Sequence, residues 1–89
     1  MVSKVLTIKT ENGLHVRPAG VLVSVCRPFD ADVMLKFNNI EYNLKSVLGI
    51  VSADIKYGDA VEFICTGPEE AQVLEAIKKA VEAGLTDVS

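Results

Sequence analysis

The sequence has no tryptophan, one histidine, two cysteines and three prolines among 89 residues. So few cysteines exclude a domain held together by several disulfides, and Cys26 and Cys65 also lack the C-x-x-C spacing of zinc and redox sites. Both cysteines stand inside apolar segments, and free cysteine is among the most buried residue types. We therefore expect two reduced, buried thiols and no metal or cofactor.

Long apolar runs and an excess of positive charge are missing as well. No run approaches the roughly 18 apolar residues of a membrane-spanning helix, and the polar N-terminus gives no signal peptide, so a cytoplasmic protein is expected. The 9 Lys+Arg stand against 12 Asp+Glu, for a formal net charge of -3. Nucleic-acid-binding domains carry a basic surface that neutralises phosphates, so this balance argues against such a role.

The composition that remains is that of one small folded domain. Hydrophobic residues make up 49% and charged residues 24% of the chain, as in globular rather than disordered proteins. A length of 89 residues lies below the roughly 100–200 that are usual for one domain. A single domain over residues 1–89 is therefore expected.

Hydrophobic periodicity predicts an alternation of strands and helices. Strands are expected at 4–9, 32–37, 40–44 and 61–65, and helices at about 16–27, 47–53 and 68–83. In the last helix we expect Gly67 at the N-cap, Pro68 in the first position and Gly84 at the end. The order β-α-β-β-α-β-α, with one apolar face on each element, favours an α+β fold of two layers, with the helices on one face of a sheet.

The single histidine stands at the expected entrance of the first helix. Arg17 follows His15 by two positions, and Pro18 fits the first helical turn, where its missing N–H costs nothing. The free N–H groups of a helix N-terminus and a guanidinium together favour a phosphate. A neutral imidazole is a nucleophile at pH 7 and can accept a phosphoryl group. A surface or capping histidine without chemistry explains the spacing equally well.

Two further features concern the surface near this histidine. Apolar residues that face away from the core predict a partly exposed docking patch beside basic groups, although burial under loops explains any one of them as well. Its members are Val16, Gly20, Val21, Ser24, Val47, Leu48 and Val51, near Arg17 and Arg27. Ser46 precedes the short helix and fits an N-cap, a role that needs no other function.

The segments 12–19 (NGLHVRPA) and 43–49 (NLKSVLG) resemble the active-site and regulatory-site motifs of the HPr family. These are the histidine-containing phosphocarriers of the bacterial phosphoenolpyruvate:sugar phosphotransferase system. The resemblance covers essentially the whole chain in length and element order. It implies an open-faced β-sandwich, in which three helices cover one face of a four-stranded antiparallel sheet. It also implies a stoichiometric carrier for sugar transport rather than an enzyme.

The resemblance implies a role for individual residues too. Enzyme I phosphorylates His15 on Nδ1 at the expense of phosphoenolpyruvate, with Arg17 beside it, and the group passes to a sugar-specific enzyme IIA. Ser46 is the site of an ATP-dependent HPr kinase/phosphorylase in the Gram-positive form, which implies catabolite repression through a transcription factor. The implied partner surface comprises Arg17, Gly20, Val21, Ser24, Arg27, Val47, Leu48 and Val51. A monomer without membrane insertion or direct nucleic-acid contact is expected.

Some residues depart from the family pattern, and other functions stay open. Val16 replaces the Ala or Thr common after the histidine, and Val47 and Leu48 stand where Ile and Met are frequent. A ferredoxin-like module that binds a metabolite is one alternative, and an assembly role for the patch is another. A copper chaperone is disfavoured, because its first loop should carry paired cysteines. Phosphate labelling distinguishes a carrier from a metabolite-binding module, whose melting temperature a metabolite would raise.

Overall fold

The computed structural model describes residues 1–85. These residues form, in order, β1 (Val2–Thr7), α1 (Val16–Cys26), β2 (Asp32–Phe37), β3 (Ile40–Asn43), α2 (Val47–Ser52), β4 (Ala60–Thr66) and α3 (Glu70–Glu82). The order β-α-β-β-α-β-α is the expected one, with shifted boundaries. β1 ends two residues early because the opposite segment turns there: the N–H of Asp59 donates to the Lys56 carbonyl, and the N–H of Gly58 takes its place at the Ile8 carbonyl, at 2.7 Å. None of the helices described is long and apolar enough to cross a membrane.

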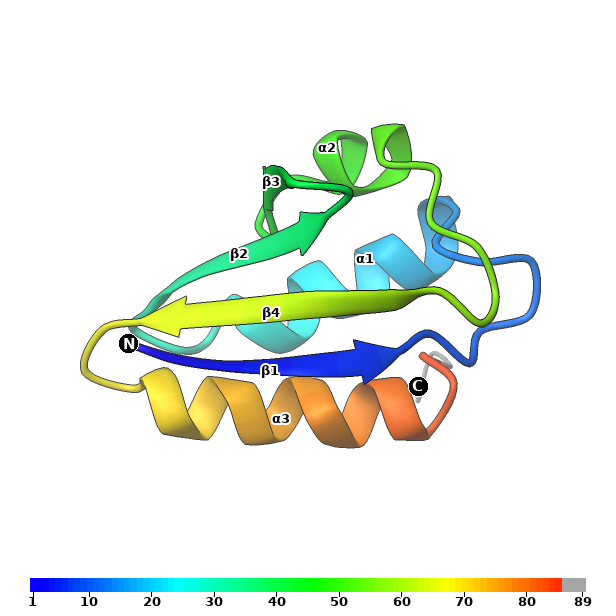
Figure 1. Ribbon diagram of the computed structural model, residues 1–89. Helices are drawn as coiled ribbons and strands as arrows, with labels where there is room; N and C mark the ends of the chain where they lie inside the picture. Colours follow the sequence, from blue (N-terminus) through cyan, green and yellow to red (C-terminus); the bar gives the residue numbers. More distant parts are fainter. Residues whose placement is uncertain (86–89) are drawn as a thin grey trace.

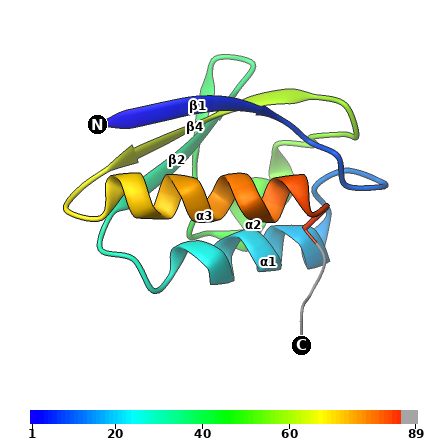
Figure 2. The same cartoon turned by 90° about the horizontal axis from the view of Figure 1, so that it is seen from below.

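The four strands form one antiparallel sheet in the order β1-β4-β2-β3. β4 pairs with both β1 and β2, so the last strand of the chain lies in the interior of the sheet. Figures 1 and 2 show the helices gathered on one side of this sheet, with α1 and α3 next to each other. The predicted open-faced sandwich of two layers is therefore confirmed.

The core fills the space between the helices and one face of the sheet. Leu35 of β2 stands opposite Phe63 of β4, and both side chains are fully buried against the helices. Cys26 and Cys65 are also free and fully buried, as expected. Burial, and next the neighbouring Cys65 thiol, raise the pKa of Cys26 to about 12, while Lys45 acts weakly in the opposite direction. The thiols therefore stay protonated at neutral pH.

The start of α3 differs from the sequence prediction. Its N-cap is Glu69 and its first residue is Glu70, so Gly67 and Pro68 precede the helix. The helix begins later than predicted because Glu69 is bonded to the loop before β2. The Asp30 N–H donates to Glu69 Oε1 at 2.8 Å, and the Glu69 N–H donates to the Asp30 carbonyl at 3.1 Å. The other end agrees with the prediction, since Gly84 follows the helix with a φ of 82°.

Candidate functional site

His15 is the N-cap residue of α1. Its backbone is extended, with φ -82° and ψ -170°, and its carbonyl accepts the N–H of Ala19 at 3.0 Å, which starts the helix. The side chain is exposed and makes no capping hydrogen bond. The imidazole therefore stands at the helix entrance, as the sequence predicts, and is accessible to a partner.

The first turn of α1 provides groups that bind an anion. Because the first N–H groups of a helix have no acceptor inside it, those of Val16 and Arg17 point out of the N-terminus. Pro18 lies in this turn, as predicted, and has no N–H to leave unpaired. The turn contains no acidic side chain, so its positive end is not neutralised locally. The helix terminus would therefore stabilise an oxyanion placed beside His15.

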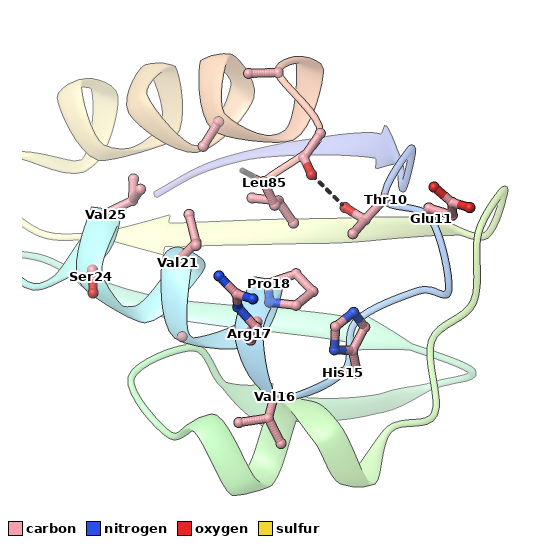
Figure 3. Close-up of a pocket in the computed structure, with 14 residues that line it drawn as sticks. Thr10, Glu11, His15, Val16, Arg17, Pro18, Val21, Ser24, Val25 and Leu85 are labelled. Atoms are coloured by element: carbon pink, nitrogen blue, oxygen red, sulfur yellow. Dashed lines mark hydrogen bonds between the residues drawn. The ribbon is translucent and has the colours of Figure 1, made fainter. Parts of the chain in front are cut away.

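A groove of about 980 Å³ runs past this helix entrance. One wall is α1, which contributes a series of side chains, and the opposite wall comes from the loop after β1 and the end of α3 (Figure 3). The α1 side is lined by His15, Val16, Arg17, Pro18, Gly20, Val21, Ser24 and Val25, and the opposite side includes Thr10, Glu11 and Leu85. Among residues 1–85, no group of three His, Cys, Asp or Glu side chains could hold a metal ion.

The residues of the predicted partner surface lie in three places. Gly20, Val21 and Ser24 line the groove with His15 and Arg17, whereas Arg27 lies at the C-cap of α1 and is exposed. Val47, Leu48 and Val51 belong to α2, which packs against α1. Leu48 is 81% exposed and Ile50 is fully buried, so the short helix α2 does not bury all of its apolar residues.

The loop that carries His15 is fastened on both sides. Leu14 is buried, and its N–H donates to the Ile55 carbonyl at 2.9 Å. On the other side, the hydroxyl of Thr10 donates to the Gly84 carbonyl at 3.3 Å (Figure 3). Sequence reasoning predicted neither of these two contacts. The signal that the sequence offered was Gly13, because a glycine often marks a close approach of two backbones; here its φ is 76°, and its ideal Cβ would lie only 2.3 Å from the Ile55 carbonyl oxygen.

Ser46 is the N-cap of α2, as predicted. Its Oγ accepts the N–H of Gly49 at 3.1 Å, and the residue is exposed. The hydroxyl thus satisfies one of the free donors of the helix start while remaining at the molecular surface.

Comparison with known proteins extends these observations to the whole fold. The family model "PTS HPr component phosphorylation site" matches residues 2–83. The chain is 33% identical over 79 residues to the phosphocarrier protein HPr of Treponema pallidum (strain Nichols), covering 89% of this chain and 90% of that protein. It is similar to solved HPr-C-His of Thermoanaerobacter tengcongensis (TM-score 0.92, 27% identity, 100% of both chains). It is also similar to solved HPr of Bacillus anthracis str. Ames (TM-score 0.85, 31% identity, 90% of this chain and 95% of that chain).

These matches agree with the two motifs and with the observed topology. The family model covers nearly all the residues that the structure describes, and it includes both His15 and Ser46. The likeness to solved structures extends over the strands and helices as well as the site. The chain therefore belongs to the HPr family, the phosphocarrier proteins of the phosphotransferase system.

Proposed function

We propose that this protein carries a phosphoryl group on His15, which it takes from phosphorylated enzyme I and gives to a sugar-specific enzyme IIA. The observation that carries the proposal is the position of His15. Its exposed imidazole stands at the N-cap of α1, beside the first-turn N–H groups and Arg17. An exposed ring can be reached by two different proteins in turn, as a carrier requires.

Each transfer breaks one bond to phosphorus as it forms another. The lone pair of His15 Nδ1 attacks the phosphorus, and the group of enzyme I that carried the phosphoryl group leaves with the electron pair of the bond that breaks. In the second step His15 is the leaving group and the acceptor histidine is the nucleophile. The helix N–H groups and the Arg17 guanidinium offset the charge of the bound phosphate. Because they lie at an open surface, they hold it without trapping it. The carrier is consumed and regenerated stoichiometrically.

Phosphate labelling tests this proposal. Purified enzyme I and phosphoenolpyruvate should add one phosphate to the wild-type protein, measured by mass spectrometry, and brief acid treatment should remove it. His15→Ala should gain none, whereas Ser46→Ala, the matched control, should gain one as the wild type does. A phosphate that still appears on His15→Ala, or a wild type that gains none, contradicts the proposal.

The partner surface of the proposal comprises Arg17, Gly20, Val21, Ser24, Arg27, Val47, Leu48 and Val51. Its support is that Val16 and Leu48, which are 61% and 81% exposed, belong to two helices that pack against each other, because neighbouring exposed apolar side chains are typical of docking sites. Val5 is a matched control. It is 60% exposed and pairs with Glu62 on the outer face of the sheet, away from the helices. Leu48→Ala should raise the KM of enzyme I for this protein, and Val5→Ala should leave it unchanged.

We also propose that Ser46 is phosphorylated by an ATP-dependent HPr kinase/phosphorylase, which slows transfer to His15 and permits binding of a catabolite-control transcription factor. The support is an exposed hydroxyl two residues before Leu48. A phosphate would place about -1.5 to -2 charges beside the partner surface and repel an acidic enzyme I.

Charge and capping at Ser46 can be separated by two substitutions. Ser46→Asp and Ser46→Asn both keep a good N-cap, so both should retain nearly the wild-type free energy of unfolding. Only the aspartate adds a charge, and only it should slow the phosphorylation of His15. Equal rates for the two variants with purified enzyme I would refute the charge mechanism.

For the remaining properties we infer a monomer that acts in the cytoplasm, without a cofactor. The support for the monomer is that the exposed apolar residues lie on different parts of the molecule, such as Val5 on β1, Ile40 on β3 and Leu48 on α2. Sedimentation at several concentrations tests it, and a mass that rises with concentration would show self-association instead.

A further inference from the structure

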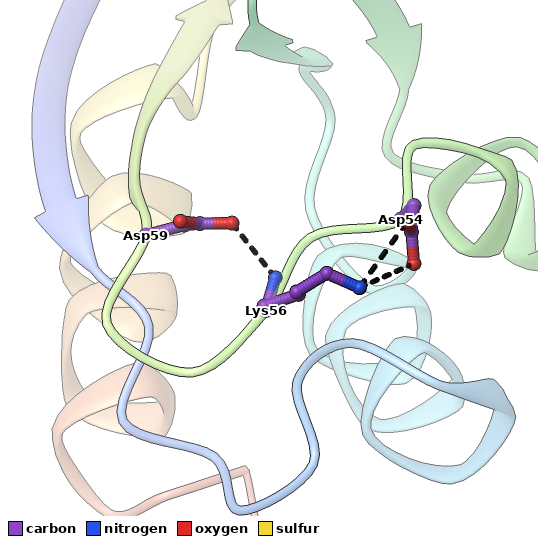
Figure 4. Close-up of polar contacts among 3 residues, drawn as sticks. All are labelled: Asp54, Lys56 and Asp59. Carbon is purple, nitrogen blue, oxygen red and sulfur yellow. Dashed lines mark hydrogen bonds and ion pairs between the residues drawn. The ribbon is translucent and has the colours of Figure 1, made fainter.

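The turn between α2 and β4 is closed by the side chain of Asp59. Its Oδ2 accepts the backbone N–H of Lys56 at 2.9 Å, and its own N–H donates to the Lys56 carbonyl at 3.1 Å (Figure 4). Asp54, which lies in the same turn, behaves differently. Its side chain bonds to the ammonium of Lys56, at 3.3 Å, and not to the backbone, and the side chains of Asp54 and Lys56 are 81% and 71% exposed. Such a surface ion pair contributes little.

This turn is bonded to both ends of the loop that carries His15. At one end, the carbonyl of Asp59 accepts the N–H of Ile8 at 2.8 Å, and the N–H of Gly58 donates to the Ile8 carbonyl at 2.7 Å. At the other end, the N–H of Leu14 donates to the Ile55 carbonyl at 2.9 Å. The turn therefore sets where the loop leaves β1 and where it enters α1.

The backbone of Gly13, two residues before His15, is packed directly against the backbone of Ile55 and Lys56. An ideal Cβ on Gly13 would lie 2.3 Å from the Ile55 carbonyl oxygen and 2.8 Å from the Lys56 Cα, so the two backbones touch. His15 N–H then donates to the Gly13 carbonyl at 3.1 Å, and the His15 carbonyl begins α1. A displacement of Ile55 is therefore transmitted through Leu14 to the reacting residue.

We infer that Asp59 is a positioning residue for phosphoryl transfer, because its side chain fixes the turn that holds the backbone of Leu14, the residue before His15. The inference rests on the proposed phosphorylation of His15 and adds a determinant that lies outside the groove. Asp59 touches neither the imidazole nor the first turn of α1. It acts through the carbonyl of Ile55, which a loosened turn would no longer hold opposite Leu14.

Three substitutions separate the hydrogen bond from the charge. Asp59→Ala removes the acceptor for the Lys56 N–H, and Asp59→Asn keeps an oxygen there without the charge. Asp54→Asn is the matched control, because it removes the same charge from the same turn without breaking a side-chain bond to the backbone, and asparagine tolerates the φ of 54° at this position. All are compared as full chains at a temperature where urea unfolding shows them to be fully folded.

Phosphorylation by purified enzyme I should respond only to the loss of the acceptor. For Asp59→Ala we expect kcat/KM to fall about threefold to tenfold, mainly through kcat because the partner surface is unchanged. Asp59→Asn should stay within about twofold of the wild type, and Asp54→Asn should equal it. Amide hydrogen exchange of Leu14 should accelerate by a similar factor in Asp59→Ala alone.

The possible failures are distinguishable. Wild-type phosphorylation and exchange rates for Asp59→Ala would overturn the inference, and so would a defect of equal size in Asp59→Asn. A loss of rate that appears only as a raised KM would assign Asp59 to docking and overturn it too. A wild-type protein that gains no phosphate would instead overturn the proposed function at His15.

Discussion

Replacing Gly13 by alanine should displace the loop that carries His15. The residue has a φ of 76°, and its ideal Cβ would lie 2.3 Å from the Ile55 carbonyl oxygen, whereas real Cβ contacts are essentially never under 3.0 Å. The oxygen belongs to backbone and cannot rotate away as a side chain would. Accommodation therefore requires the Ile55 carbonyl to move, and this carbonyl accepts the N–H of the buried Leu14.

The expected loss of stability has two parts. A left-handed backbone costs an alanine roughly 1–2 kcal/mol, of which the reduced entropy of the unfolded chain offsets roughly 0.4–1 kcal/mol. Breaking the bond between Leu14 and Ile55 leaves buried polar groups unpaired, at about 1–3 kcal/mol. Gly13→Ala should therefore lower the free energy of unfolding by about 3 kcal/mol, which most small domains survive.

Gly58→Ala is the matched control for the backbone part. Its φ of 90° is also left-handed, but nothing lies within 4 Å of its ideal Cβ, so it should lose only about 1 kcal/mol. Urea unfolding followed by circular dichroism measures both variants. Equal losses in the two proteins would refute the role assigned to the Ile55 contact. Phosphorylation of Gly13→Ala by enzyme I should also be slower than that of Gly58→Ala under folding conditions.

Three other predictions concern groups away from the imidazole. Thr10→Val should lower the free energy of unfolding by about 1 kcal/mol, because it removes the bond to the Gly84 carbonyl, and Thr10→Ser should retain most of it. Burial raises the pKa of Cys26 to about 12 and also raises the pKa of Cys65. A thiol reagent at pH 8 should therefore react with neither cysteine in the folded protein and with both in urea. Between pH 9.0 and about 12 the unfolded chain loses the Cys26 proton and the folded protein keeps it. The free energy of unfolding should therefore fall as pH rises through this range, and urea titrations at alkaline pH measure the fall. The Met1 ammonium, and next the Gly67 N–H, lower the pKa of the Glu70 carboxyl from 4.5. The ionised carboxylate therefore stabilises the folded state above pH 4.5, and this stabilisation is lost as the pH falls below that value. Glu70→Gln should flatten the acid side of the stability profile.

Sequence reasoning succeeded where structure follows local rules. Alternating residues such as Val33 and Leu35 located β2, because one face of a strand is buried and the other is not. The capping role of Ser46 and the place of Pro18 followed from which backbone N–H groups a helix leaves unpaired. The entrance position of His15 was predictable for the same reason.

Sequence reasoning failed where contacts join distant segments. Nothing local to Thr10 or Leu14 indicates that Gly84 and Ile55 are their partners, because those contacts exist only once β1 has paired with β4. The start of α3 failed for a related reason. A rule that places proline in the first helical turn was overridden by the bonds between Glu69 and Asp30, which are 39 residues apart.

The position of β4 between β1 and β2 has a consequence for how this chain acquires its function during synthesis. Neither neighbour can complete its ladder until residues 60–66 have been made, so most of the sheet forms late and through pairings distant in sequence. The turn that supports His15 immediately precedes β4, and Gly84 comes later still. A nascent chain that has emerged only through α2 therefore presents the histidine before the contacts with the segment 55–59 and with Gly84, which hold its loop in the folded protein, have formed.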